Sequence, residues 1–396
     1  MDGQLTASTV ESGPPGTIRP SLSDGCIALQ LNDPNAVPTL LKQIEKNGST
    51  FRLNDGAASS VRLDLLNAAR FLVYALETPR EAMVRHCWSQ STTFAAIEIS
   101  VNLGLFKFLA VDDRPKTGFS KAMTTPRFGD SYPCIYPIYK TGCITAGCLA
   151  LPEYFKNRGY RSPDDSRNCP FQFAFQTSLH FFEFLQANPA ISSLFHNHMS
   201  TYHLGRPSWI DDGFYPIEER LIRIASSSPE DVLIVDVGGS LGHDLSEFRR
   251  KFLQAPGRLV LQDLPTMLSQ VENLDTDIEL MAHDFFKVQP VKSARAYYLH
   301  SILHDWNDDK CRNILTNLKD AMNPGYSKIL INENVVPETN ANWETTSLDI
   351  ILMAESASQE HTLCQWHALI GSVGMNIVKI YSTEHDAESL IECELA

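Results

Sequence analysis

The sequence predicts a doubly wound α/β domain with a seven-stranded, Rossmann-like sheet, preceded by a mostly helical region. From residue 217 onward, short apolar runs of strand length alternate with segments of helical periodicity. The first run passes through a glycine-rich turn into a helix, which is typical of nucleotide-binding sheets. The last two runs are joined only by residues 382–388, too short for a crossover helix. The final strand is therefore expected to be antiparallel in an otherwise parallel sheet.

The expected strands share an apolar composition and the lengths of buried strands. They are 232–237, 258–262, 278–281, 294–300, 328–334, 375–381 and 389–394, with helices expected between them.

The helices of the amino-terminal half are bounded by recognisable signals. One is expected at 34–48, ending at Gly48, and a second begins with Ser59 or Ser60 as N-cap and stops before Pro79. A third is expected over 80–109, followed by a loop at 111–133 and helical segments at 146–155 and 170–194. The apolar surface of the helices at 61–109 favours packing against another subunit, so we expect a homodimer, although an intrachain core is equally allowed.

Composition excludes several classes of protein. The chain has 396 residues, 43% hydrophobic and 20% charged, and a net charge of -14 that argues against nucleic-acid binding. Its sequence has no apolar run long enough to span a membrane, and its first residues resemble a tail rather than a signal peptide. Nine cysteines without CxxC pairs favour free thiols, so we expect a soluble cytoplasmic protein without a metal site.

The glycine turn decides which nucleotide fits. It reads Asp236-Val-Gly238-Gly239-Ser-Leu-Gly242, which matches neither the G-x-G-x-x-G dinucleotide fingerprint nor a P-loop. A carboxylate at Asp236 suits a cationic ligand group, and Asp263 could accept both hydroxyls of a ribose. A ligand with a positive amino-acid end and a ribose is S-adenosylmethionine. The alternative is that Asp236 and Asp263 only cap turns.

Two later positions carry further chemistry. Asp284 and Phe285 follow the third strand, where a carboxylate and an aromatic ring could hold an adenine. His304 lies just beyond the carboxyl end of the fourth strand, where a histidine can accept a proton from a phenol or enol. The alternative for His304 is a solvent-exposed loop histidine.

Four ordered motifs carry a family resemblance. They are residues 234–243 (IVDVGGSLGH), 263–265 (DLP), 284–286 (DFF) and 303–308 (LHDWND). With them the chain resembles the class I O-methyltransferases of fungi and plants, of the caffeate/flavonoid type. The resemblance implies a small-molecule substrate, S-adenosylmethionine as cofactor, and methyl transfer to a hydroxyl of a small aromatic or polyketide-type secondary metabolite.

The resemblance also assigns roles to residues. It implies His304 as general base, flanked by Glu333 and Glu360, since a carboxylate that accepts the imidazole N–H fixes the tautomer and raises basicity. Substrate contacts are expected from Arg206, Asp305 and Met353. The expected cofactor-binding residues are Asp236, Gly238, Gly239, Gly242, Asp263, Leu264, Asp284, Phe285 and His300.

Three departures from the family pattern matter. Ser240 replaces a glycine of the turn, and His300 stands where the family often has Arg or Lys. Residues 109–136 are also too few for the usual winged-helix module. We therefore expect a tail at 1–25, a helical dimerisation and substrate-pocket domain at 26–215 with that module largely deleted, and a catalytic domain at 216–396.

The shortened amino-terminal half also resembles the methyltransferase-like pericyclases of fungal 2-pyridone pathways. Those enzymes bind S-adenosylmethionine but catalyse dehydration, Diels–Alder or retro-Claisen steps. Under this alternative His304, Asp305 and Arg206 would donate hydrogen bonds to a carbonyl. The intact set of His304, Glu333 and Glu360 favours methyl transfer.

Overall fold

The computed structural model describes residues 30–52, 59–111, 119, 123, 138–139, 144–202, 207–226, 228–272, 274–382 and 388–396. The chain divides into two compact units, Met1–Ile97 and Glu98–Ala396. The expected tail at 1–25 lies outside the described residues, as does nearly all of the expected loop at 111–133.

The first unit is helical. It contains α2 (Val37–Thr50), α3 (Ser60–Leu76), α4 (Pro79–Val84) and a π-helical turn, η1 (Arg85–Gln90). Ser59 caps α3 by accepting the N–H of Arg62, as expected for an N-cap serine. Thr78 and Glu81 cap α4 reciprocally. α2 runs past the expected end at Gly48, because Gly48 keeps an ordinary helical conformation.

The expectation of one helix over 80–109 is wrong. The segment is divided into α4, η1, α5 (Ser91–Asn102) and α6 (Leu105–Val111). Gly104 between α5 and α6 has φ +65°, a left-handed conformation that ends a helix and that glycine adopts without strain.

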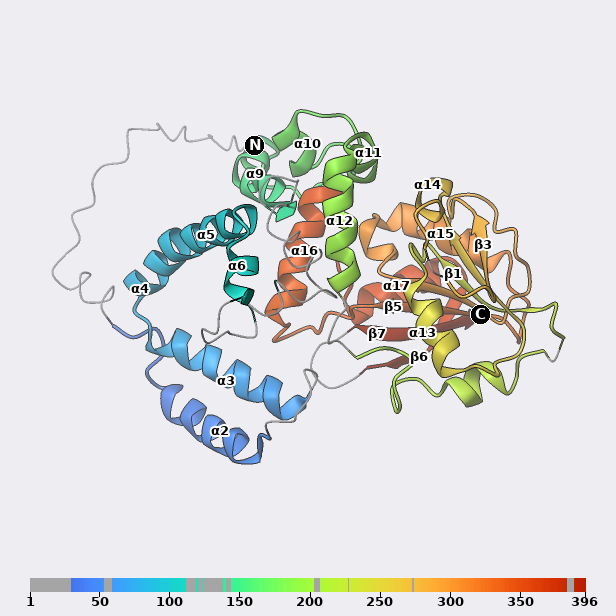
Figure 1. Ribbon diagram of the computed structural model, residues 1–396, viewed down its shortest axis with the longest axis horizontal. Helices are drawn as coiled ribbons and strands as arrows, with labels where there is room; N and C mark the ends of the chain where they lie inside the picture. Colours follow the sequence, from blue (N-terminus) through green and yellow to red (C-terminus); the bar gives the residue numbers. More distant parts are fainter. Residues whose placement is uncertain are drawn as a thin grey trace, which may run out of the picture. The chain divides into compact units, whose positions relative to one another are not determined.

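Four further helices precede the sheet in the second unit. They are α9 (Ile144–Asn157), α10 (Pro170–Phe175), α11 (Phe181–Ala187) and α12 (Pro189–Tyr202). The expected helical segment at 170–194 is therefore three helices, and Gln176, at φ +50°, ends the first of them. α9 and α10 pack against each other and against the later helix α16 (Trp343–Ser356) (Figure 1). Phe171 and Phe181 are buried in the core that these helices form.

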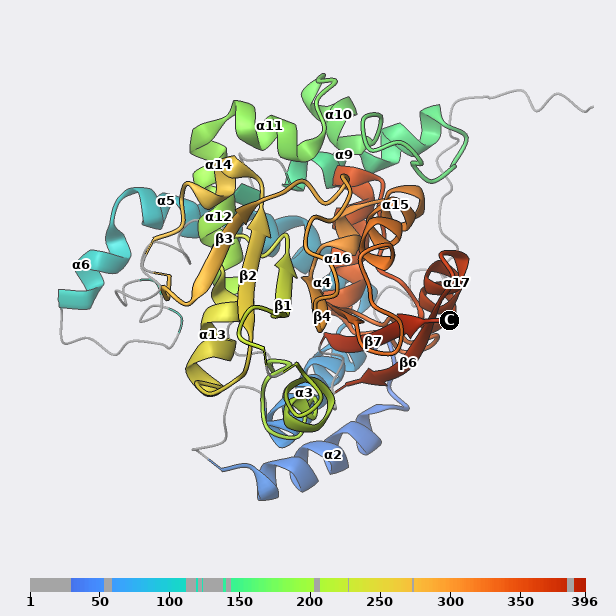
Figure 2. The same cartoon turned by 90° about the vertical axis from the view of Figure 1, so that its right-hand side faces the viewer.

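The sheet has the strand order β3-β2-β1-β4-β5-β7-β6 (Figure 2). Its strands are β1 (Val232–Val237), β2 (Arg258–Asp263), β3 (Ile278–Ala282), β4 (Ala296–His300), β5 (Lys328–Glu333), β6 (Met375–Tyr381) and β7 (Ser389–Leu395). β7 is antiparallel to both β5 and β6, whereas the other pairs are parallel, which confirms the expected fold class. The chain order reverses between β1 and β4, and ligands of such sheets bind at the carboxyl ends of the strands at this point.

Helices cover both faces of the sheet. On one face α15 (Asp308–Lys319) and α17 (Leu363–Ser372) pack on Val235, Tyr297 and Ile331. On the other, α13 (His243–Lys251) and the segment 209–221, which includes most of η3 (Glu218–Ile222), pack on Ile234, Tyr298 and Leu330. The remaining short helices are α14 (Pro265–Leu268) and η4 (Leu303–Asp305).

The expectation of a helix in every connection is wrong between β3 and β4. Residues 283–295, all described, form turns and irregular structure there. This connection starts at the carboxyl edge of the sheet, where Phe285 lies close to Gly238, and then runs to the amino edge, where β4 begins. It therefore carries Asp284 and Phe285 to the switch point.

Candidate active site

The glycine turn after β1 leaves no room for side chains. A Cβ on Gly239 would lie 2.3 Å from Asp236 Oδ2 and 2.5 Å from Leu261 Cδ1. Gly238 and Gly242 have φ +75° and +77°, and Ser240 adopts φ +53°. The turn is fixed to β2, since the Gly238 N–H donates to the Gln262 carbonyl over 2.8 Å. Each glycine of the motif is thus required by shape or by backbone conformation.

Asp236 has the properties of a residue that binds a cation. It is 1% exposed at the end of β1, and neither carboxylate oxygen has a hydrogen-bond partner among the described residues. Burial and the nearby Asp244 raise the pKa of Asp236 well above its usual range. A positive group placed beside Asp236 would offset the unfavourable free energy of burying its carboxylate. The ammonium group of S-adenosylmethionine fits this requirement.

Asp263 is oriented by two backbone donors. Its Oδ2 accepts the Ser240 N–H over 2.9 Å and its Oδ1 accepts the Leu264 N–H over 2.6 Å. Each oxygen keeps a lone pair for a ribose hydroxyl, so turn capping and ligand binding are compatible here. Burial raises the pKa of Asp263, and His196 on α12 lies close enough to oppose that shift electrostatically. Leu264, which follows on the chain, is 38% exposed.

The connection after β3 places an aromatic ring beside the glycine turn. Asp284 accepts the Phe286 N–H over 2.9 Å, and the Phe285 carbonyl accepts from Asn317 over 3.1 Å. A Cβ on Gly238 would lie 3.5 Å from Phe285 Cε1. Phe285 is therefore positioned to contact a planar ring bound at the turn.

His300 lies at the end of β4 and bridges two carboxylates. Its Nδ1 is 2.7 Å from Asp244 Oδ2 and its Nε2 is 2.9 Å from Glu388 Oε2. Although burial lowers the pKa of His300, these two carboxylates raise it well above its usual range. No motif in the sequence indicated Asp244 or Glu388, which come from α13 and from the residue before β7. A contact between His300 and the cofactor stays a prediction.

His304 is a buried histidine, so the alternative of a solvent-exposed loop histidine is wrong. It lies on η4, is 7% exposed, and its Nδ1 is 3.1 Å from Glu360 Oε1. Glu360 is itself held in place by Asn334 Nδ2, which donates to the same oxygen over 3.0 Å. Because Glu360 engages Nδ1, the Nε2 atom of His304 is left to face an acceptor.

Glu333 supports the backbone around His304 rather than its ring. Its Oε1 accepts the N–H groups of Ile302, over 3.1 Å, and Leu303, over 2.6 Å. Its Oε2 is buried without a hydrogen-bond partner among the described residues. Glu333 therefore positions the short helix that carries His304.

The charges around His304 favour its protonated form. Burial lowers the pKa of His304, but Asp305, Glu360 and Glu333 outweigh burial and raise it to about 10. Burial raises the pKa of Asp305 to about 6 and that of Glu333 to about 7. Once its proton is removed, the His304 imidazole is therefore a strong base. The Asp305 and Glu333 carboxyl groups around it hold their protons more tightly than usual.

The expected substrate residues fall in different places. Asp305 Oδ1 lies 3.8 Å from His304 Nε2, so Asp305 lies on the side of the ring that faces an acceptor. Met353 is half-buried on α16, a helix that packs against η4. Arg206 lies outside the described residues. Trp306 stacks on His180 with ring centroids 4.9 Å apart, a contact between the end of η4 and the helical region that the sequence did not indicate.

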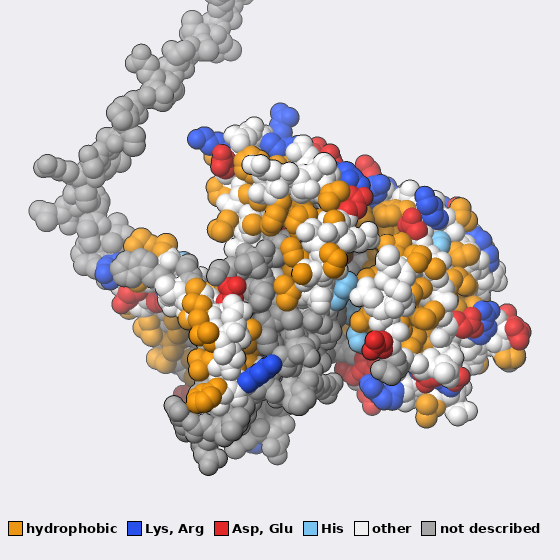
Figure 3. Space-filling view, turned by 45° about the horizontal axis from the view of Figure 1, so that its top comes forward, with side chains coloured by type: hydrophobic (Ala, Val, Ile, Leu, Met, Phe, Trp, Pro, Cys, Tyr) orange, Lys and Arg blue, Asp and Glu red, His pale blue; other side chains and the backbone are white. Residues whose placement is uncertain are grey.

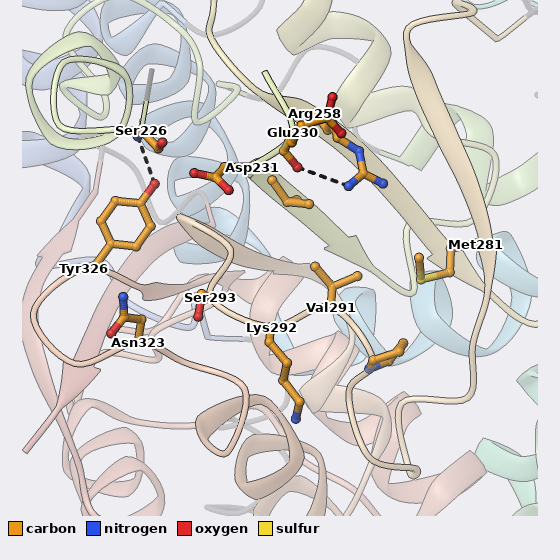
Figure 4. Close-up of a pocket in the computed structure, with 12 residues that line it drawn as sticks. Ser226, Glu230, Asp231, Arg258, Met281, Val291, Lys292, Ser293, Asn323 and Tyr326 are labelled. Carbon is orange, nitrogen blue, oxygen red and sulfur yellow. Dashed lines mark hydrogen bonds between the residues drawn. The ribbon is translucent and has the colours of Figure 1, made fainter. Parts of the chain in front are cut away.

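A cavity of about 540 Å³ lies at the opposite edge of the sheet (Figure 4). It is lined by Val232 and Arg258 at the starts of β1 and β2, and by Tyr326 before β5. The Arg258 guanidinium is paired with Glu279 over 2.5 and 2.6 Å. None of the predicted site residues line this cavity, which is remote from the carboxyl ends of the strands.

Comparison with known proteins places the chain in a family. Residues 219–376 match the family model of an O-methyltransferase domain. The O-methyltransferase mpaG of Penicillium brevicompactum is 32% identical over 391 residues, covering 89% of this chain and 98% of that protein. The mpaG protein of Penicillium roqueforti is 34% identical over 397 residues, covering 91% and 99%. The chain belongs to the O-methyltransferase family.

Solved structures agree with this assignment. A variant of LepI, in complex with SAH and a substrate analogue, superposes with a TM-score of 0.78 at 26% identity, covering 91% of this chain and 99% of LepI. OxaC, at 23% identity and a TM-score of 0.73, shows the same fold. As a member of this family the chain is an S-adenosylmethionine-dependent enzyme, and the predicted cofactor is confirmed. No described helix has the length and hydropathy needed to cross a membrane.

Proposed function

We propose that this chain transfers a methyl group from S-adenosylmethionine to a hydroxyl of a small aromatic or polyketide-type secondary metabolite, with His304 as the general base. The observation that carries the proposal is the buried pairing of His304 Nδ1 with Glu360 at 3.1 Å, which leaves Nε2 for the acceptor. The relatives support the substrate class, since one of them, from Aspergillus parasiticus, is a demethylsterigmatocystin 6-O-methyltransferase.

The chain would hold its cofactor at the carboxyl ends of β1, β2 and β3. Asp236 would bind the ammonium group beside Gly238, Gly239 and Gly242, and Asp263 with Leu264 would bind the ribose. Asp284 and Phe285 would bind the adenine, with His300 at the adjacent strand end. When bound, S-adenosylmethionine supplies a methyl group on an already activated sulfonium, so positioning accounts for most of the catalysis.

The chain's own contribution is to remove one proton. His304 would take the hydroxyl proton of the acceptor at Nε2, and Glu360 at Nδ1 would stabilise the imidazolium that results. Asp305, Met353 and Arg206 would contact the acceptor. Glu333 would keep η4 in place through the N–H groups of Ile302 and Leu303.

Transfer of labelled methyl groups tests this role. Purified protein is incubated with methyl-labelled S-adenosylmethionine and a panel of phenols and hydroxylated polyketide aromatics. We expect label in the organic product and a loss of about 10²–10⁴-fold in rate for His304→Ala. His367→Ala, at an exposed histidine on α17, is the matched control and should keep full rate. Equal rates for the two variants would overturn the role of His304.

A second candidate function is an S-adenosylmethionine-dependent pericyclic or dehydration reaction. Its support is LepI, described as a pericyclic reaction enzyme, which covers 91% of this chain at 25% identity and a TM-score of 0.77. The proton that His304 holds at neutral pH also suits donation to an acceptor carbonyl. The pairing of His304 with Glu360 favours methyl transfer, because a base needs a carboxylate behind it whereas a simple donor does not.

We also propose a division of labour along the chain. Residues 216–396 would form the catalytic domain, residues 26–215 would form the dimerisation and substrate-pocket domain, and residues 1–25 would be a tail. Hydrophobic side chains lie among polar ones on the face that Figure 3 shows. On α3 they are Phe71, Val73, Tyr74 and Leu76, with exposed fractions of 63%, 55%, 58% and 44%. A second copy of the chain would cover such a face in a homodimer.

A further inference from the structure

Glu355 is a buried acid that the proposed chemistry does not yet use. It lies in the last turn of α16 and is 6% exposed, and its Oε1 has no hydrogen-bond partner among the described residues. A carboxylate is unfavourable at the carboxyl end of a helix, where the helix dipole is negative. Burial without a partner adds a further cost. Among the described residues nothing pairs with Oε1, so this atom is available to a bound ligand.

The backbone at Glu355 is held firmly. Its carbonyl accepts a hydrogen bond from Cys169 Sγ over 3.1 Å. α9 approaches closely at the preceding residue, since a Cβ on Gly147 would lie 3.7 Å from the Ala354 carbonyl oxygen. Ser356 and Ser358 close the helix end through a hydroxyl pair 2.9 Å apart. The side chain therefore starts from a fixed point.

Glu355 is carried by a helix that packs next to the element bearing His304. α16 packs against η4, the element that carries His304 and Asp305. Glu360 occupies the Nδ1 side of the ring, whereas Asp305 lies 3.8 Å from Nε2. The charge of Asp305 in turn acts on Glu355. An acceptor hydroxyl at Nε2 would therefore lie beside Asp305, the residue whose charge acts on Glu355.

The protonation state of Glu355 decides what it can bind. Burial, followed by the charge of Asp305, raises the pKa of Glu355 well above its usual range. This shift favours the carboxylic acid form of Glu355, which can donate one hydrogen bond.

We propose that Glu355 is an acceptor-binding residue that donates a hydrogen bond to a second oxygen of the acceptor, next to the hydroxyl that faces His304. The acceptors are then phenols with an adjacent ether, hydroxyl or carbonyl oxygen. This inference rests on the proposed function, because it takes the Nε2 side of His304 to be the acceptor site.

Two nearly isosteric phenols test the inference by binding alone. 2-Methoxyphenol and 2-ethylphenol differ in one oxygen, and their Kd values for the enzyme loaded with S-adenosylhomocysteine are measured by calorimetry. We expect the wild type to prefer 2-methoxyphenol about 10-fold, since one unmade hydrogen bond at a buried donor costs roughly 1–3 kcal/mol. Glu355→Gln, which keeps a donor, should retain the preference, and Glu355→Leu should lose it. Glu338→Gln, at an exposed position, is the control and should change nothing.

Two results would overturn the inference. One is an equal affinity of the wild type for both phenols. The other is that 2-(aminomethyl)phenol binds the wild type more tightly than either of the other phenols and that Glu355→Gln abolishes this preference. Glu355 would then act as a carboxylate that binds a cation. Thermal melting of each variant shows that it is folded. Failure of the proposed function is separate: no phenol would be methylated, while the preference of the wild type for 2-methoxyphenol, and its loss in Glu355→Leu, would still be measurable.

Discussion

Among single residues, the charge balance around His304 sets the behaviour of the enzyme. One imidazole lies among Asp305, Glu360 and Glu333, and these carboxylates raise its pKa to about 10. An ordinary histidine has a pKa near 6.5 and would already be largely deprotonated at neutral pH. The chain therefore has a base whose strength approaches that of a phenolate, at the expense of holding its proton in the resting state.

This balance predicts the pH dependence of the reaction. A neutral phenol can be deprotonated only by neutral His304, and below the pKa the neutral fraction grows about tenfold for each unit of rising pH. We expect kcat/KM for the acceptor to rise with pH and to bend near the His304 pKa of about 10. Asp305→Asn removes the carboxylate with the largest raising effect, so its bend should move to lower pH. A wild-type profile that is flat from about pH 6.5 would show that His304 does not hold its proton as inferred.

Asp236 gives a prediction for stability. Its pKa in the folded protein is raised above the unfolded value, so its contribution to stability is complete below about pH 3.8 and is lost as pH rises through the folded pKa. Asp236→Asn should therefore raise the Tm of the cofactor-free protein at pH 7, by about 2–4 °C per kcal/mol recovered. The same variant should lose the Tm increase that S-adenosylmethionine gives the wild type. Thermal scans with and without cofactor check both effects, and a lower Tm with unchanged cofactor response would count against this role.

Among the helices, strands and turns, the glycine turn shows how well local pattern predicts structure. The run 232–237 and the turn at 238–242 were expected from apolar content and glycine spacing alone, and they form as expected. The single helix expected over 80–109 was wrong, and Gly104, at φ +65°, accounts for the break between α5 and α6. The helix expected between β3 and β4 was wrong, since residues 283–295 form turns and irregular structure there.

Two glycine substitutions separate close packing from helix propensity. Gly239→Ala would place a Cβ against Asp236 and Leu261, so it should reduce cofactor affinity by at least about 10-fold. Gly371→Ala, on α17, meets nothing within 4 Å and should stabilise the protein by about 0.5–1 kcal/mol. Cofactor titration and urea unfolding measure the two effects. Unchanged cofactor affinity in Gly239→Ala would show that the turn is not the cofactor cradle.

In the molecule as a whole, the site is assembled from segments far apart in the sequence. The motifs indicated Asp236, Asp263 and His304, because the chemistry expected of each is tied to a local pattern, and the family resemblance indicated Glu360. They could not identify Asp244, Glu388 or Asn334, which act on other site residues only after the sheet has formed. The buried acid Glu355 was also missed, since its meaning depends on burial and on the lack of a described partner.

The exposed apolar face of α3 predicts the oligomeric state. Covering Phe71, Val73 and Tyr74 on two copies removes apolar area from water, which favours association. We expect light scattering after size exclusion to give about twice 44.3 kDa at micromolar concentration. Replacing Phe71 and Tyr74 by serine should shift the protein toward the monomer. A monomeric wild type would contradict the expected homodimer.

The proposed function requires that the cofactor give up its methyl group rather than lend only its charge. The decisive measurement is the stoichiometry of a complete reaction with an accepted phenol, following S-adenosylhomocysteine and acceptor together by mass spectrometry. Methyl transfer predicts one S-adenosylhomocysteine formed for each acceptor consumed, and a product heavier by one methyl group in place of one hydrogen. Acceptor converted to an isomer or a dehydration product, with S-adenosylmethionine unchanged, would contradict it.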